Sequence, residues 1–258
     1  MSDGAPLLDQ LPLRLDVLLL LAAAGLYLVD NAQLLFANEV LFVRKGAGAW
    51  SARFPGGAEL LGRFPVLVEP LQPGRPAFRA AWPTAPRPPE DSRRAAEALE
   101  QALAALAPIK YLAAALLPQA FVVLPAAYWW SGANVLLVSG LAALIYVQAI
   151  AMAVVLLVRK PRLNISWRTA VSLAFESLVC PPYAINLYKK AAMAASHSIA
   201  DVLVAAEALL PKADRAPFYQ KIAAAANDLL QWNDGSARAA KLIEFCRTVE
   251  EKAKCSSS

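Results

Sequence analysis

Histidine and cysteine are scarce in this chain of 258 residues. His197 is the only histidine, which excludes sites that need two or more histidine ligands, such as a di-iron Glu-x-x-His site or a bis-histidine haem site. The three cysteines (Cys180, Cys246 and Cys255) are an odd number without zinc-type spacing, so they give no disulfide framework. We therefore expect no metal ion and no other cofactor.

Motifs that bind phosphate or activate a serine are also missing. The chain has no GxxxxGKS/T loop, no GxGxxG fingerprint and no GxSxG elbow. His197 and Asp201 stand four residues apart at an expected helix start, where such a pair is typical of a surface contact rather than of a proton relay. No catalytic constellation remains, which disfavours an enzyme without excluding one.

Charged residues make up only 17% of the chain and hydrophobic residues 58%, against about 25% and about 45–50% in soluble proteins. The surplus gathers in three blocks that each approach or exceed the roughly 20 residues needed to cross a bilayer: 17–36, 109–130 and 135–158. An acidic tail precedes the first block, which favours a retained anchor over a cleaved signal peptide. The blocks predict an α-helical multi-pass membrane protein with three transmembrane helices.

The positions of lysine and arginine predict the orientation. Ten of them lie between 44 and 110, and Arg159, Lys160 and Arg162 follow the third block, whereas the turn at 131–134 has no charge. Because basic residues stay on the cytoplasmic side, the N-terminus is expected outside and the C-terminus in the cytoplasm. The bias towards Ala, Arg and Pro favours a bacterial inner membrane.

Proline and glycine divide the rest of the chain. We expect six segments: 1–36, the tail and first transmembrane helix; 37–91, a β-rich cytoplasmic loop and Pro-rich linker; 92–108, an amphipathic helix; 109–158, a transmembrane hairpin; 159–190, a basic turn and an interfacial or re-entrant helix; and 191–258, a three-helix module. In the β-rich loop we expect three or four strands, with Pro65 and Pro70 on an edge strand. Pro118 and Pro125 should kink the second transmembrane helix.

Helical spacing in the C-terminal module predicts one helix from Ser196 or Ser198 to Pro211, a second from about Pro217, and a third from about Ser236. The last seven residues are expected to fray.

Glu176 is the first candidate for a functional residue. In a helix over 165–179, Arg168, Ser172 and Glu176 fall at i, i+4 and i+8 and form one polar stripe, with apolar residues opposite. Pro181 disfavours helical geometry at Cys180, so the helix should end there. About fourteen residues are too few to cross, and both flanks are basic, which indicates an in-plane or re-entrant helix.

Asp30 is the second candidate, because an ionisable group at bilayer depth costs about 2.5–3.5 kcal/mol. The first transmembrane helix can slide to 11–29, which leaves Asp30 at the inner boundary, and we favour that placement over a buried site.

The net charge of +5 is explained by basic flanks on anionic lipids, so no nucleic-acid partner is expected. The sequence favours a non-enzymatic scaffold or accessory subunit that docks protein partners through the β-rich loop and the C-terminal helices. Two alternatives stay open. One is a transporter or channel component with Glu176 and Asp30 as a proton or cation site; the other is a membrane enzyme acting on lipids.

Overall fold

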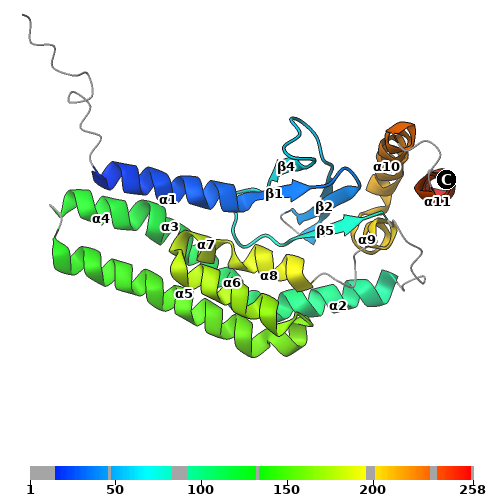
Figure 1. The fold of residues 1–258 in the computed structure, drawn as a ribbon. Coiled ribbons are helices and arrows are strands. Elements are labelled where there is room, and N and C mark those ends of the chain that lie inside the picture. The colour runs from blue at the N-terminus through cyan, green and yellow to red at the C-terminus, as the bar shows by residue number, and fades with distance from the viewer. Residues whose placement is uncertain are drawn as a thin grey trace, which may run out of the picture.

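The structure is a computed structural model that describes residues 15–45, 48–82, 92–131, 134–195, 201–232 and 237–256. The chain is mostly helical, at 71%, with a small sheet region. Long helices lie side by side at one end, and the strands and C-terminal helices gather at the other (Figure 1). The expected Pro-rich linker 83–91 lies outside the described residues, and so does His197, the expected partner of Asp201.

The first apolar block divides into a helix and a strand, which corrects the prediction of one helix up to Phe36. Helix α1 spans Leu15–Asn31 and strand β1 spans Ala32–Leu35. The Asn31 side-chain amide donates to the Tyr27 carbonyl (3.0 Å) in the last turns of α1. The Asn31 carbonyl accepts from the Val68 amide (3.2 Å), so the chain leaves the helix by joining a sheet.

The predicted sheet region is present, with one strand more than expected. β1 pairs antiparallel with β4 (Phe64–Leu67), and β2 (Glu39–Arg44) lies between β3 (Trp50–Arg53) and β5 (Ala77–Ala81). Pro65 lies in β4, which has only β1 as a neighbour, in agreement with its assignment to an edge strand. β1 escaped prediction because its residues continue the apolar run of α1.

The helical hairpin begins with an amphipathic helix, α2 (Ser92–Ala105). Its first arm consists of α3 (Ala107–Pro118), the π-helical segment η3 (Gln119–Val123) and α4 (Leu124–Trp130), and its second arm is α5 (Val135–Leu163). The helix continues through both prolines of the first arm, and η3 provides the local widening between them. The Asn134 side chain caps α5 by accepting from the amides of Leu136 (3.1 Å) and Leu137 (3.3 Å).

The segment after α5 folds back on itself. α6 (Trp167–Val179) begins after the Ser166 cap and ends at Cys180, whose backbone is extended before Pro181, as predicted. A short α7 (Pro181–Ile185) makes the turn, and α8 (Leu187–Ala195) returns towards the sheet (Figure 1). α6 packs along α5 and also contacts α8, so the segment forms a hairpin beside the long helices.

The C-terminal helices are α9 (Val202–Leu209), α10 (Lys212–Trp232) and α11 (Ala237–Ser256). Three expected boundaries are wrong. The side chain of Asp201 caps α9, α10 begins five residues before Pro217, and α11 continues through the expected frayed tail as far as Ser256. Pro217 lies inside α10, beyond its first turn, so its missing N–H removes the backbone hydrogen bond that a helix would make to the carbonyl of residue 213.

The C-terminal helices pack on the sheet instead of forming a separate bundle. The Phe218 ring of α10 lies 5.6 Å from Phe42 and 5.4 Å from Phe54, measured between centroids. Trp82 after β5 stacks on Phe245 of α11 at 6.2 Å. One hydrophobic cluster therefore joins the sheet, the C-terminal helices and the ends of the long helices.

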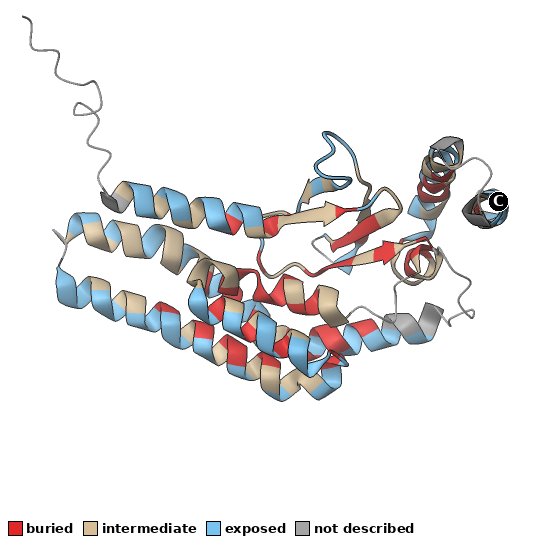
Figure 2. Cartoon of the chain, in the orientation of Figure 1, coloured by how far each residue is buried: buried red, intermediate tan, exposed pale blue. Residues whose placement is uncertain are grey.

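Exposure differs between the two ends of the molecule (Figure 2). Buried residues concentrate where the sheet, α2 and α6–α8 meet, whereas the far parts of α1, α4 and α5 are largely exposed or half-buried. Within the described chain, Ala107–Trp130 and Val135–Leu163 are long and apolar enough to cross a membrane, and α1 is apolar but shorter.

The substitution Phe218→Ala tests whether the docking of α10 on the sheet is part of the core. Phe218 is 4% exposed, and removing a buried phenylalanine ring costs about 3–5 kcal/mol. The free energy of unfolding in urea should fall by that amount, whereas Ile243→Ala, at a side chain 59% exposed, should change it by less than about 0.5 kcal/mol. Equal effects of the two substitutions would contradict the shared core.

Candidate functional site: the lysine junction

Two adjacent lysines on α8 join the end of α1 to the returning hairpin and to the sheet. Successive residues on a helix point about 100° apart, so the two ammonium groups reach different neighbours. We call this group of six residues the lysine junction: Asp30, Asn31, Glu176, Asn186, Lys189 and Lys190.

Lys190 bridges the two carboxylates that the sequence had singled out separately. Its Nζ lies 2.5 Å from Oδ1 of Asp30 and 3.1 Å from Oε2 of Glu176. The second oxygen of Asp30 accepts from Nδ2 of Asn186 (2.9 Å), and Oε1 of Glu176 accepts from the Ser172 hydroxyl (3.2 Å). Asp30 and Glu176 thus belong to one ion triad, although 146 positions separate them in the chain, from 30 to 176.

Burial and the neighbouring charges shift the pKa of Lys190 in opposite directions. Burial alone would lower its pKa, but the hydrogen bond and the negative charge of Asp30, reinforced by Glu176, raise the pKa above its ordinary value. The Nζ also lies 4.9 Å from the centroid of the Tyr183 ring. The two carboxylates therefore favour the charged form of Lys190.

Lys189 has neutral partners instead of carboxylates. Its side chain is almost fully buried, and its Nζ donates to Oδ1 of Asn31 (2.7 Å) and to the carbonyls of Val68 (2.9 Å) and Glu69 (3.1 Å). These three acceptors use all three donors of an ammonium group. Burial lowers the pKa of Lys189 to about 8, because the charges of Glu69 and Asp30 only partly compensate for the lost solvation.

The contacts of Lys189 continue into the sheet through Glu69. The Glu69 carboxylate pairs with Arg53 of β3 (2.9 Å) and with Arg75 before β5 (2.5 Å). Gln33 of β1 accepts from Arg79 of β5 (2.7 Å). A chain of polar contacts therefore connects α8 and α1 with both sheets.

The remaining predicted site residues have different surroundings. Ser172 reaches Glu176, as the helical stripe implies, but Arg168 is exposed and forms no hydrogen bond or ion pair with any described residue. Asp30 lies one residue before the end of α1, with 10% of its side chain exposed, whereas 42% of the Glu176 side chain is exposed.

Four members of the junction were missed as site residues: Asn31, Asn186, Lys189 and Lys190. Lys189 and Lys190 served only to orient the chain, and Asn186 carried no signal at all. A usable signal existed, because Asp30 and the pair Lys189–Lys190 carry opposite charges at the ends of two apolar segments. Pairing them would still have required knowing that the end of α1 and the start of α8 lie at the same level.

Comparison with known proteins found no matching family model, no matching curated protein and no matching solved structure.

The junction is arranged to hold its members in place. Asp30, Asn31, Gln33, Asn186 and both lysines line one narrow crevice, and the Lys190 ammonium fills the position between the two carboxylates where a free cation would otherwise sit. Buried, well-partnered groups of this kind fix the relative placement of the elements that carry them.

The unequal burial of the two carboxylates predicts unequal contributions to stability. Lys190→Gln leaves the Asp30 carboxylate buried without its counter-ion, which should cost about 3–5 kcal/mol of unfolding free energy. Glu176→Gln removes the charge of a side chain that is 42% exposed and should cost about 0–1 kcal/mol of unfolding free energy. Urea unfolding of the protein in mild detergent measures both values.

The double variant Asp30→Asn/Lys190→Gln is the matched control. It removes both charges together and should be more stable than the sum of the single losses indicates. Strict additivity would show that the pair is not coupled.

Lys189 predicts a rise in stability at alkaline pH. Its folded pKa of about 8 lies below the value of about 10.4 in an unfolded chain, so between these limits the unfolded state holds more protons. Stability therefore increases with pH in that window, by about 2 kcal/mol between about pH 7.5 and about pH 9.5. Below about pH 8 both states are protonated and the contribution is constant.

The measurement compares wild type with Lys189→Met by urea unfolding at both pH values. The unfolding free energy of wild type should rise from the lower to the higher pH by more than that of Lys189→Met, and this difference is the contribution of Lys189. If both proteins respond equally to pH, the titration does not belong to Lys189.

Proposed function

We propose that this chain is a multi-pass protein of a bacterial inner membrane and acts as a non-enzymatic scaffold. In this proposal α1, the α3–η3–α4 arm and α5 cross the bilayer, with the N-terminus outside and the C-terminus in the cytoplasm. The sheet and α8–α11 form the cytoplasmic part, held against the membrane by the lysine junction.

The observation that carries the membrane proposal is the exposed apolar surface of the long helices. Only 11% of the most apolar stretch of Ala107–Trp130 and 28% of that of Val135–Leu163 are buried, whereas a core helix of a soluble protein is mostly buried. Leu19 (63% exposed) and Leu136 (86%) are examples on α1 and α5. Apolar surface of this extent is favourable against lipid and unfavourable against water.

The arrangement of the ends supports the orientation. The start of α1 and the turn between α4 and α5 lie at one end of the molecule, and the sheet, α2 and the C-terminal helices lie at the other (Figure 1). Lys160 and Arg162 in the last turn of α5 belong to the second end. Basic residues mark the cytoplasmic side, so the whole sheet–helix part faces the cytoplasm in this proposal.

The hairpin of α6, α7 and α8 favours a re-entrant segment over an in-plane helix. α6 runs alongside α5, and α8 brings the chain back to the end from which α6 started (Figure 1). α6 has 13 residues, about 20 Å at 1.5 Å per residue, which is less than the hydrocarbon thickness. Trp167 (60% exposed) and Phe175 (66%) on α6 would contact lipid.

The transport alternative gains one observation, because Asp30 and Glu176 lie together. Lys190 already pairs with both carboxylates, however, and a cation site would have to displace a tethered ammonium. A rigid support for cytoplasmic partners agrees better with a junction whose charged groups all have hydrogen-bond or ion-pair partners.

The β-rich loop and the C-terminal helices were expected to dock partners. Part of these faces is covered within the molecule, because α10 packs on the sheet. A different apolar surface stays open on and next to β4, where four leucines are exposed: Leu60 (55%), Leu61 (94%), Leu67 (47%) and Leu71 (82%). The loop that leads into β4 stands out from the body (Figure 1). We assign partner docking to this leucine surface, because leucines exposed this close together in the chain are unfavourable in water unless a partner covers them.

A photo-crosslinking amino acid at Leu61 in living cells tests the scaffold. We expect a discrete protein adduct that Leu71→Asp reduces at least about fivefold, since a charge in an apolar interface is costly. The same crosslinker at Ile243 on α11 is the control and should give no such adduct. Adducts with lipid alone, or a protein adduct that Leu71→Asp leaves unchanged, would contradict docking at this surface.

A further inference from the structure

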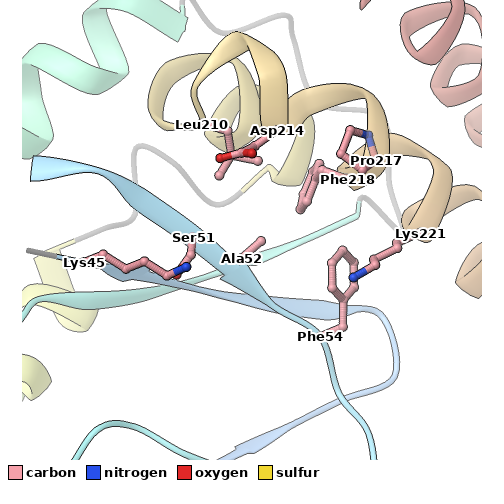
Figure 3. Close-up of a pocket in the computed structure, with 9 residues that line it drawn as sticks. All are labelled: Lys45, Ser51, Ala52, Phe54, Leu210, Asp214, Pro217, Phe218 and Lys221. Atoms are coloured by element: carbon pink, nitrogen blue, oxygen red, sulfur yellow. The ribbon is translucent and has the colours of Figure 1, made fainter. Parts of the chain in front are cut away.

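A cleft separates β3 from the first half of α10 on the sheet side of the molecule (Figure 3). It has a volume of about 200 Å³. Six residues give it its chemical character: Lys45, Ser51, Phe54, Asp214, Phe218 and Lys221. We call it the β3–α10 cleft.

Aromatic rings form its apolar part. Phe54 and Phe218 point into the cleft from the strand side and from the helix side (Figure 3), and their centroids are 5.4 Å apart. Phe218 is anchored from behind by Phe42, at 5.6 Å, so this wall is fixed by the core. An apolar body of a ligand can lie against it without reorganising the protein.

Positive charge approaches the rings from two elements. Lys45 follows β2 and Lys221 belongs to α10, and the two side chains enter the cleft from opposite ends (Figure 3). Among the described residues neither lysine has a carboxylate within ion-pair distance, and the Lys221 ammonium lies 5.9 Å from the Phe54 centroid. Lys190 and Lys252, by contrast, each pair with a carboxylate.

Asp214 limits which anion fits. Its carboxylate lies at the helix side of the cleft, and no described residue forms an ion pair with it. A carboxylate at that position repels a second negative charge and accepts a hydrogen bond from a donor. Two cations and one anion leave a net charge of +1, which one negative group on a ligand neutralises.

We infer that the β3–α10 cleft binds a small organic monoanion, a carboxylate with an apolar or aromatic body. One of the two lysines would hold the carboxylate, and the wall formed by Phe54 and Phe218 would hold the body. The volume is below the roughly 300–1,000 Å³ of sites for drug-sized ligands, which excludes a nucleotide or a long peptide. This inference concerns the part of the chain outside the long helices and does not depend on the scaffold proposal.

Titration of the full chain in lipid nanodiscs with phenylacetate, followed by ligand-observed NMR, tests the inference. Benzyl alcohol supplies the ring without the charge, acetate supplies the charge without the ring, and phenyl phosphate carries a second charge. Phenylacetate should bind at least about fivefold more tightly than each of the three, which is the ratio expected for one contact ion pair in water. Empty nanodiscs give the background from partition into lipid.

Matched variants locate the site. Lys45→Gln/Lys221→Gln should weaken phenylacetate binding at least about tenfold, and Asp214→Asn should strengthen it by about twofold to fivefold. Lys212→Gln removes the same charge from the start of α10 without touching the cleft and should change binding by less than about twofold. The inference is overturned if phenylacetate does not bind at about 10 mM, if benzyl alcohol binds equally well, or if the lysine variants bind like wild type.

Discussion

The contact between the Lys190 ammonium and the Asp30 carboxylate is the interaction on which the architecture depends. It connects the end of α1 with α8, although Asp30 and Lys190 lie far apart in the chain. Lys189 extends the same connection to the loop after β4 through the carbonyls of Val68 and Glu69. Because adjacent positions on one helix supply both ammonium groups, the placement of α8 determines how the long helices meet the sheet.

This connection has a cost that the surroundings offset. Burying two adjacent cations is unfavourable, as the lowered pKa of Lys189 shows. Asp30 and Glu176 compensate Lys190 with charge, and Asn31 and two backbone carbonyls compensate Lys189 with dipoles. Buried polar groups that are satisfied in this way favour one arrangement of the elements over its alternatives. A sheet–helix part fixed in orientation relative to the long helices is what a supporting subunit at a membrane needs.

Much of the local structure follows from the sequence, and the site does not. The lengths of the hydrophobic runs predicted the long helices at 109–130 and 135–158. The spacing of glycine and proline predicted the sheet region. Pro181 predicted the end of α6. These features are set by interactions within about ten residues of each other. The end of α1 at Asn31 depends instead on a strand pairing with residues 64–67, and no local pattern reports such a pairing. Glu176 and Asp30 were each found as isolated carboxylates, but their common partner Lys190 becomes visible only when the hairpin of α6 and α8 brings it between them.

The central claim is that the three long helices cross a bilayer with the lysine junction at the cytoplasmic end. Labelling of Cys255 with a membrane-impermeant maleimide, in a chain carrying Cys180→Ser and Cys246→Ser, tests it most directly, and Ser131→Cys with Cys255→Ser reports the opposite end. The account predicts that intact cells label the cysteine at 131 and leave Cys255 unlabelled until the membrane is opened. Labelling of Cys255 in intact cells would contradict the three-crossing arrangement and would return α6 to consideration as a crossing helix.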